Sequence, residues 1–260
     1  MRRCVFCGWE GTLTKEHAWP KWIRDVLPKG QVKGYSQQHR IAVGTGRVTE
    51  ITGTLRHPAA DRQVKVVCQR ECNGGWMSQL ELAAKPVLVP LILGERPHLS
   101  EQDQMLLAFW AAKTAMMLQF IHPADIRGIP TAHYQWVYER REAPPDMRVW
   151  LSAASDHFYR TAHYTRARRL PGAIPPWLRP PPDEPTPPDA YTAVMVIGRL
   201  VLSLVGWKTS DWDFTVAPDD RWAPARRCIW PPRPGGWSWP PDVVLGSRID
   251  VERFAAAATH

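Results

Sequence analysis

Four of the five cysteines in the chain form two close pairs, a pattern that is typical of metal-binding thiolates. Cys4 and Cys7 are separated by two residues and Cys68 and Cys72 by three, with residues 8–67 between the pairs. Each spacing lets two thiolates reach one tetrahedral Zn²⁺ at about 2.3 Å. We therefore predict one structural zinc ion; the alternative is four ordinary buried thiols. Cys228 is left over, and we expect it to be a buried hydrophobic side chain.

Acidic, imidazole and amide side chains accompany the two cysteine pairs. Glu16 and His17 lie between the pairs, and Asn73 directly follows Cys72. This order resembles the zinc-stabilised branch of the HNH endonuclease family. In that branch a C-x-x-C pair precedes an acidic residue and a His, and a second cysteine pair followed by Asn opens a helix. The resemblance covers roughly residues 1–86.

The resemblance implies a role for each of these side chains. By position, Glu16 and Asn73 would bind Mg²⁺ or a similar divalent cation, and His17 would be the general base that activates water. Oxygen ligands suit Mg²⁺, and the ordinary pKa of imidazole, about 6.5, suits the base. The implied activity is metal-dependent hydrolysis of phosphodiester bonds in nucleic acid, with double-stranded DNA as the expected partner.

The sequence departs from the family pattern at three places. The segment before the second cysteine pair is longer than usual, and we expect residues 31–61 to be an inserted β-ribbon. Gln63 stands where the family has the Asn that orients the base, so by position it takes that catalytic role. Trp76 replaces a Lys that is common in the helix. Glu81 could face the site one turn further along, or equally be an exposed helix residue.

The net charge of +8 lies almost entirely in the cysteine-containing part of the chain. Residues 1–99 hold 15 Lys and Arg against 8 Asp and Glu, whereas residues 100–260 hold 18 against 17. Four zinc-bound thiolates would reduce the excess by about two charges and leave it basic. Such a surface suits phosphate binding; a merely solubilising charge explains it equally well.

Composition indicates a globular protein, and we expect it to be cytoplasmic. The N-terminus lacks an apolar stretch long enough for a signal peptide. The longest apolar run, residues 192–205, is interrupted by Arg199 and is shorter than the roughly 20 residues that a membrane span needs. Reduced cysteines in that compartment favour metal binding over disulfides.

Hydrophobic periodicity predicts the elements that position these side chains. Helical spacing predicts helices over residues 21–27, from 73 until Pro86, over 100–120 with Ser100 as N-cap, and over 131–141. Strand patterns cover residues 38–43, 47–55, 63–67, 147–153 and 158–166, and a hairpin over 193–205 divides at Gly198. The proline-rich residues 171–188 predict a loop, and the tail from Trp222 an irregular segment.

We therefore predict an α+β protein with two domains. Residues 1–99 would form a small ββα-metal HNH domain with a zinc knuckle and the inserted ribbon. Residues 100–260 would form a mixed domain of two or three helices on an antiparallel sheet. No motif in that second domain indicates whether it selects the substrate, binds a partner or mediates assembly.

Two other functions remain open from the sequence. The protein could be a zinc-knuckle nucleic-acid binder in which Glu16 and His17 are structural, or a sensor whose second domain controls a nuclease. Trp19 and Trp22 could stack on bases, although packing against the knuckle is the preferred interpretation. A basic cluster could make a second nucleic-acid contact or be a solvated strand face: Arg160, Arg166, Arg168 and Arg169.

Overall fold

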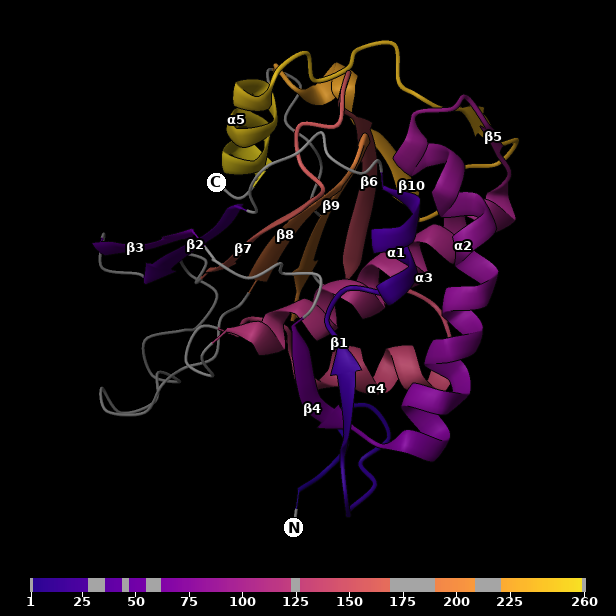
Figure 1. Cartoon of the computed structure of the whole chain (residues 1–260), viewed down its shortest axis with the longest axis vertical. Helices are drawn as coiled ribbons and strands as arrows, with labels where there is room; N and C mark the ends of the chain where they lie inside the picture. The colour runs from indigo at the N-terminus through magenta and orange to yellow at the C-terminus, as the bar shows by residue number, and fades with distance from the viewer. Residues whose placement is uncertain are drawn as a thin grey trace.

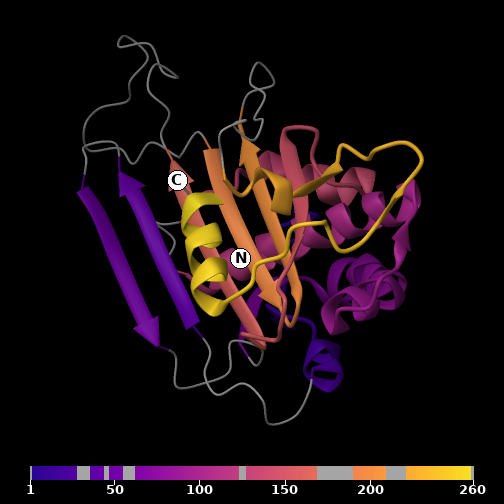
Figure 2. The same cartoon turned by 90° about the horizontal axis from the view of Figure 1, so that it is seen from above.

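The computed structural model of the chain describes residues 2–27, 36–43, 47–54, 62–122, 127–168, 190–208 and 221–258, with only the backbone of strands 36–43 and 47–54. Its largest element is a seven-stranded sheet in the order β10-β6-β9-β8-β7-β2-β3 (Figures 1 and 2). Its strands are β2 (Ser36–Val43), β3 (Arg47–Thr54), β6 (Met147–Ala153), β7 (Thr161–Arg168), β8 (Ala190–Ile197), β9 (Leu200–Trp207) and β10 (Arg227–Trp230). Neighbouring strands are antiparallel, apart from the parallel pair β2 and β7. The mixed helix-and-sheet composition confirms the predicted α+β class.

The predicted hairpin over residues 193–205 is present as β8 and β9, and it lies in the middle of this sheet. Nearly every residue in both strands is buried, which explains why they are continuous apolar runs rather than alternating ones. The chain reverses at Gly198, whose φ of +57° favours glycine. A Cβ atom there would lie 2.7 Å from the carbonyl oxygen of Ile92. Glycine therefore permits both the turn and its close packing on a neighbouring helix.

The two faces of the sheet are covered by different helices. Along β8, Ala193 and Met195 belong to the large hydrophobic core, whereas Val194 and Val196 belong to a second, smaller core. The C-terminal helix α5 (Arg248–Ala258) contributes side chains to the second core. It lies on one face of the sheet, whereas α3 and α4 lie on the other (Figure 2). Strand alternation thus separates the two cores.

Helix α3 (Glu101–Leu118) is the central helix of the large core. Ser100 caps it in the predicted box with Asp103: the Ser100 hydroxyl accepts from the Asp103 backbone N–H, and the Asp103 carboxylate accepts from the Ser100 N–H. Every residue from 107 to 118 is buried, as the wide apolar stripe predicted. A 3₁₀ turn (Gln119–Ile121) follows, and α4 (Thr131–Arg140) packs beside α3.

The N-terminal part of the chain forms a separate two-stranded sheet followed by helices. Strand β1 (Thr14–His17) pairs antiparallel with β4 (Gln63–Val67), and the short helix α1 (Lys21–Val26) follows β1. After β4 come a π-helix, η2 (Gln69–Met77), and the long helix α2 (Ser78–Leu93). Along the chain these elements occur in the order β1, α1, β4, η2 and α2, and the two strands and the helices begin close to the predicted bounds.

The predicted end of this last helix at Pro86 is wrong. Helix α2 continues through Pro86 and Pro90 and ends at Gly94, whose φ is +84°. Each proline removes one backbone donor, which leaves the carbonyls of Leu82 and Pro86 without an intrahelical partner. Leu82 and Pro86 are both exposed, so water can satisfy these carbonyls and the helix tolerates the prolines.

The predicted ribbon within residues 31–61 is present as the β2–β3 hairpin. It joins the large sheet by pairing with β7, not the β1–β4 sheet (Figure 1). Its predicted turn, residues 44–46, lies outside the described residues, as do residues 31–35 and 55–61. The proline-rich segment predicted as a loop, 171–188, lies outside them as well.

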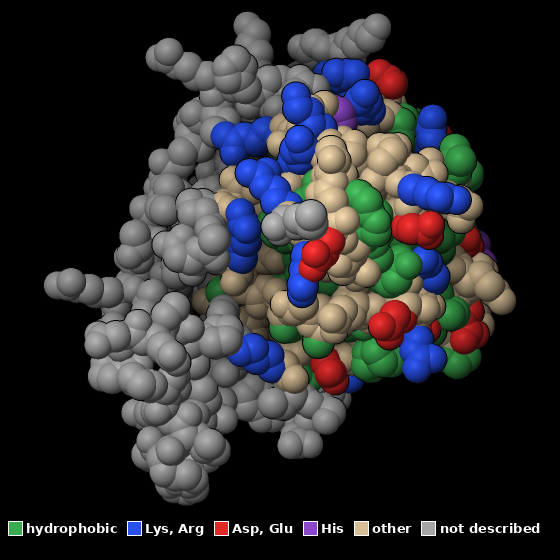
Figure 3. Space-filling view, turned by 90° about the horizontal axis from the view of Figure 1, so that it is seen from below, with side chains coloured by type: hydrophobic (Ala, Val, Ile, Leu, Met, Phe, Trp, Pro, Cys, Tyr) green, Lys and Arg blue, Asp and Glu red, His purple; other side chains and the backbone are tan. Residues whose placement is uncertain are grey.

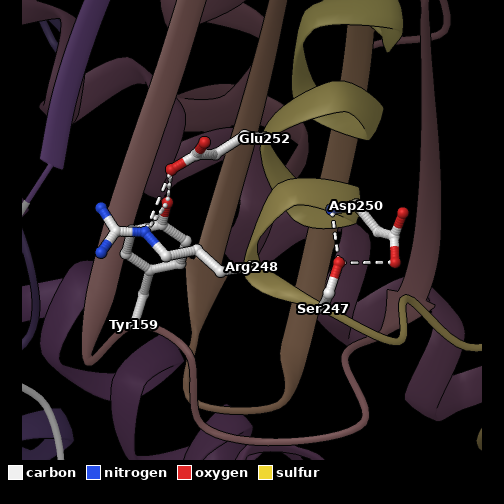
Figure 4. A network of polar contacts seen from close by, with 5 residues as sticks. All are labelled: Tyr159, Ser247, Arg248, Asp250 and Glu252. Carbon is white, nitrogen blue, oxygen red and sulfur yellow. Dashed lines mark hydrogen bonds and ion pairs between the residues drawn. The ribbon is translucent and has the colours of Figure 1, made fainter.

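The tail beyond Trp222 is more regular than its composition predicted. It contains a 3₁₀ turn (Ala223–Ala225), the edge strand β10, helix α5, and strand β11 (Trp237–Ser238), which pairs with β5 (His98–Leu99). Figure 4 shows how α5 is held: the Tyr159 hydroxyl donates to the Glu252 carboxylate and accepts from Arg248. Long-range pairing, which the tail sequence cannot reveal, orders this segment.

Ser247 caps α5, and its replacement should destabilise the helix. Its hydroxyl accepts from the backbone N–H of Asp250 at 3.1 Å and donates to the Asp250 carboxylate at 2.7 Å (Figure 4). Ser247→Ala should therefore reduce the free energy of unfolding by about 1 kcal/mol, measured by urea denaturation. Ser78→Ala is the control, because Ser78 is exposed and is not the N-cap residue of α2, which is Met77. Equal stability of both variants would contradict the role of the cap.

One hydrophobic cluster crosses the predicted domain boundary at residue 99. It includes Cys4 and Phe6 near the N-terminus, Trp110 of α3 and Leu202 of β9. The division into residues 1–99 and 100–260 stays a prediction, but the two parts share their core.

Two helical segments are long and apolar enough to span a membrane, namely Gln69–Leu93 and Glu101–Ile121. The second is enclosed by the rest of the chain, with 78% of its most apolar window buried. The first is covered in part and belongs to the same core. Both resemble core helices of a soluble protein.

Candidate functional site

The four paired cysteines converge on one point, as predicted for a metal centre. The Sγ atoms of Cys4 and Cys72 are 3.5 Å apart, and so are those of Cys7 and Cys68. All four sulfur atoms lie within 4.8 Å of one another. A tetrahedral site with Zn–S bonds of about 2.3 Å needs S–S separations of about 3.8 Å. The four side chains therefore fit a metal ion such as zinc.

The backbone around this cluster is folded to present the thiols. Gly8 donates its N–H to the Cys4 carbonyl, and its φ of +71° allows the tight turn after Cys7. On the other side, the Asn73 N–H bonds the Cys68 carbonyl at the start of η2. Each pair is thus held by a local turn. Cys228 lies outside the cluster, half-buried, and donates to the carbonyl of Trp230.

The thiols influence one another strongly. The hydrogen bond between Cys4 and Cys72 lowers the pKa of the Cys4 thiol to about 4 and raises that of Cys72. Burial raises the pKa of Cys7 to about 11. Four sulfur atoms this close cannot all ionise unless a cation lies among them, because each thiolate disfavours the next. Zinc would supply that charge and bind all four thiolates.

His17 and Gln63 face each other across the β1–β4 sheet. They are direct partners in the strand register, so their side chains lie on the same face. The His17 Nε2 atom is 2.9 Å from the Gln63 amide nitrogen. A half-turn of the amide brings its oxygen to the same place, and either orientation fixes which ring nitrogen carries the proton. The pair predicted to act as base and orienting group is therefore in contact.

Asn73 is fixed against the strand that carries Glu16 and His17. Its side-chain nitrogen donates to the Lys15 carbonyl at 3.3 Å, which leaves the amide oxygen for another partner. The helix breaks two residues later at Gly75, whose ψ of −117° is not helical. Asn73 therefore sits in an irregular turn between the cysteine centre and β1.

Glu16 lies on the opposite side of β1 from His17, because successive strand residues alternate. Its partner in β4 is the buried Val64, so Glu16 faces the core side of this small sheet. Burial raises the pKa of the Glu16 carboxyl, and the charge of Lys113 opposes that rise. No hydrogen bond joins Glu16 and Asn73 in the described part of the chain. Their joint metal binding stays a prediction.

The orientation of the Glu81 side chain, which the sequence did not determine, is inward rather than toward water. One carboxylate oxygen accepts from the indole N–H groups of Trp22 and Trp110, at 2.9 and 3.0 Å, and the other accepts from the Lys113 ammonium. Lys113 was not selected from the sequence, where it is the only charged residue in the apolar run 104–121.

Three tryptophans near the site are packed. Trp19 is fully buried, and Trp22 is engaged with Glu81, which favours the packing interpretation of both over base stacking. Trp76 is buried between Phe6 and Phe109, with ring centroids 5.1 and 5.7 Å away.

Basic side chains occur in β1, in β4 and in the segments that precede and follow these strands. The described ones are Arg2, Arg3, Lys15, Arg62, Lys65 and Arg70. Figure 3 views the molecule from below, where Lys and Arg form a band on one side and acidic groups lie mostly on the other. Of the second basic cluster, Arg160 donates to the Arg24 carbonyl, whereas the side chains of Arg166, Arg168 and Arg169 lie outside the described residues.

The fold and site thus define an α+β protein with a four-cysteine centre beside a β-β-helix unit. Comparison of the chain with models of known families, with curated proteins and with solved structures finds no match.

Proposed function

We propose that the protein is a metal-dependent endonuclease of the HNH type that hydrolyses phosphodiester bonds in DNA. The observation that carries the proposal is the contact of His17 with Gln63, in a strand whose Lys15 carbonyl accepts from the Asn73 side chain. A zinc-bound cysteine cluster would hold the ends of this unit together. The order of the side chains along the chain supports the same assignment, and so do the contacts of His17 with Gln63 and of Asn73 with the Lys15 carbonyl.

In this proposal His17 accepts the proton of the water that attacks phosphorus. When the Gln63 amide oxygen accepts from the His17 Nε2–H, it holds the ring and its tautomer, and Nδ1 keeps a lone pair for the proton. Glu16 and Asn73 offer a carboxylate and an amide oxygen, donors that suit Mg²⁺. The charge of that bound cation would stabilise the negative charge that develops on the phosphate and on the leaving 3′ oxygen.

The direct test is incubation of the purified protein with supercoiled plasmid and Mg²⁺, Mn²⁺ or Ni²⁺, beside His17→Ala. We expect nicked or linear DNA with the wild type only, and no product in the presence of a chelator. Binding of plasmid without cleavage under every metal would favour the zinc-knuckle binder instead. Cleavage by both proteins alike would place the activity elsewhere.

Basic residues beside His17 should contact phosphate. Lys65 lies two residues from Gln63 in β4 and so shares its face, while Arg62 and Lys15 flank the pair. Replacing these three with Ala should weaken DNA binding and reduce the slope of log K against log salt by up to about 3. The control triple replaces Lys85, Arg96 and Arg233, which are exposed elsewhere. Equal slopes for the two triples would show that this face does not contact DNA.

A further inference from the structure

Trp9, two residues after Cys7 of the cysteine centre, is the one exposed aromatic side chain in the part of the chain that the structure describes. It is 48% exposed, whereas Trp19 and Trp76 of the same N-terminal unit are buried. A single exposed apolar side chain is common on protein surfaces and indicates nothing by itself. Trp9 differs from such a residue because its ring is held in place and has a basic neighbour.

The indole ring of Trp9 lies against the backbone of Gly11. A Cβ atom at Gly11 would be 2.1 Å from the nearest ring carbon, so the ring occupies the space that a side chain would need there. The Trp9 carbonyl accepts from the Cys4 N–H at 2.9 Å, which ties the Trp9 backbone to the cysteine centre. A ring that is already restrained loses little conformational entropy when a ligand covers it.

The residues around Trp9 form a short antiparallel bridge with two different faces. Arg3 and Glu10 are partners in this bridge, and their side chains form an ion pair at 2.6 Å. Because strand residues alternate, Trp9 lies on the other face, together with Arg2, whose carbonyl accepts from the Gly11 N–H. Arg2 is exposed. This face therefore offers an aromatic ring and a guanidinium group.

An aromatic ring beside a cation suits the two parts of a nucleotide. The base has a flat face that stacks on an indole, and the phosphate pairs with a guanidinium. Inside a duplex both faces of each base are covered by neighbouring bases, so only a base outside the duplex stack can take this position. Lys15, Arg62 and Lys65, which lie in or beside the two strands that follow, would continue a phosphate-binding path.

We propose that Trp9 stacks on an unpaired base of the bound DNA, and that the substrate therefore contains a single-stranded segment beside the cleavage position. The inference rests on the proposed function, because it names the substrate of that nuclease. Gly11 precedes His17 by six residues, which span at most about 22 Å. The stacked base therefore lies within several nucleotides of the phosphate on which His17 would act.

Stacking is measured as the preference of the protein for an oligothymidylate over an oligomer of abasic residues with the same number of phosphates. Both labelled oligomers have about twelve residues, within the range of single-strand sites, and binding to the full-length protein is followed by fluorescence anisotropy in Ca²⁺. The wild type should prefer the oligothymidylate by about tenfold or more, because only that oligomer has bases to stack. Trp9→Ala should lose most of this preference, and Trp9→Phe should keep much of it.

Matched controls separate stacking from a general apolar contact and from misfolding. Leu82→Ala removes another exposed apolar side chain, 72% exposed and on α2, and should leave the preference unchanged. Trp9→Leu keeps an apolar side chain without an aromatic face and should behave like Trp9→Ala. Zinc content and thermal unfolding verify each fold; if Trp9→Ala does not fold, the comparison of Trp9→Phe with Trp9→Leu gives the same answer.

The outcomes distinguish this proposal from the nuclease itself. Equal affinity of the wild type for both oligomers would overturn the stacking site, and so would a wild-type preference in Trp9→Ala or Trp9→Leu. A dimer that Trp9→Ala dissociates, detected by sedimentation velocity, would assign the ring to a protein contact and overturn it too. If the preference depends on Trp9 but plasmid is not cleaved under any metal, the nuclease fails and Trp9 remains a base-stacking residue. Cleavage without the preference would leave the nuclease standing and overturn the stacking site.

Discussion

His17→Ala should reduce DNA cleavage by about 10²–10⁴-fold while leaving DNA and metal binding nearly intact. This range is typical of the loss of a general base, which moves a proton but holds neither substrate nor cation. Turnover is measured on supercoiled plasmid at saturating Mg²⁺ or Mn²⁺, and binding separately in Ca²⁺. Wild-type turnover in this variant would refute the HNH assignment, whatever the cysteines bind.

The metal-site variants should fail differently. Glu16→Ala and Asn73→Ala should raise the metal concentration needed for half-maximal rate, with partial rescue at high Mn²⁺, because their proposed role is to hold the cation. If His17→Ala shows this behaviour instead, His17 is a ligand and the base lies elsewhere.

Gln63 provides an independent check through the contact that the structure describes. Gln63→Ala removes the partner of His17 Nε2 without removing the base, so a smaller loss of rate than in His17→Ala is expected. The rate should rise with pH through the titration of a histidine, whose ordinary pKa is about 6.5, because a base must be neutral. His17→Ala should lack that rise.

Local signals in the sequence predicted much of this fold. The Ser100–Asp103 box fixes the start of α3, and Gly198 fixes the central hairpin, because each signal acts within a few residues. Cys4 and Cys72 also lie together as predicted, although they are 68 positions apart in the sequence. Metal chemistry made that long-range contact predictable, because four thiols at these spacings suggest that they bind one metal ion together.

Contacts without such a chemical signal could not be predicted from the sequence. Glu81 and Lys113 lie 32 positions apart on different helices, and only their packing shows that they pair. The ribbon within residues 31–61 was recognisable as a hairpin, but its pairing with β7 depends on strands more than 100 positions further on. Helix α2 can continue through its two prolines because the carbonyls that they leave unpaired face water, and the sequence does not show which side of the helix is exposed.

Cys68→Ser should remove zinc and destabilise the N-terminal part of the chain. In the structure Cys68 and Cys72 join Cys4 and Cys7 through the shared cluster, and Phe6 packs beside it against Trp76 and Tyr134. Structural zinc in small domains contributes on the order of 10 kcal/mol of apparent binding free energy at pH 7. Elemental analysis should find about one zinc per chain in the wild type and little in the variant.

Cys228→Ser is the matched control, since Cys228 lies outside the cluster and should leave both zinc content and unfolding unchanged. In Cys68→Ser, thermal unfolding should lose cooperativity or shift to a clearly lower midpoint. Near-ultraviolet circular dichroism should weaken as Trp19 and Trp76 lose their fixed surroundings. Because this unit shares its core with α3 and β9, the loss should also lower the stability of the seven-stranded sheet. A zinc-free wild type that unfolds at the same midpoint as the loaded protein would show that buried thiols, not metal, hold this unit together.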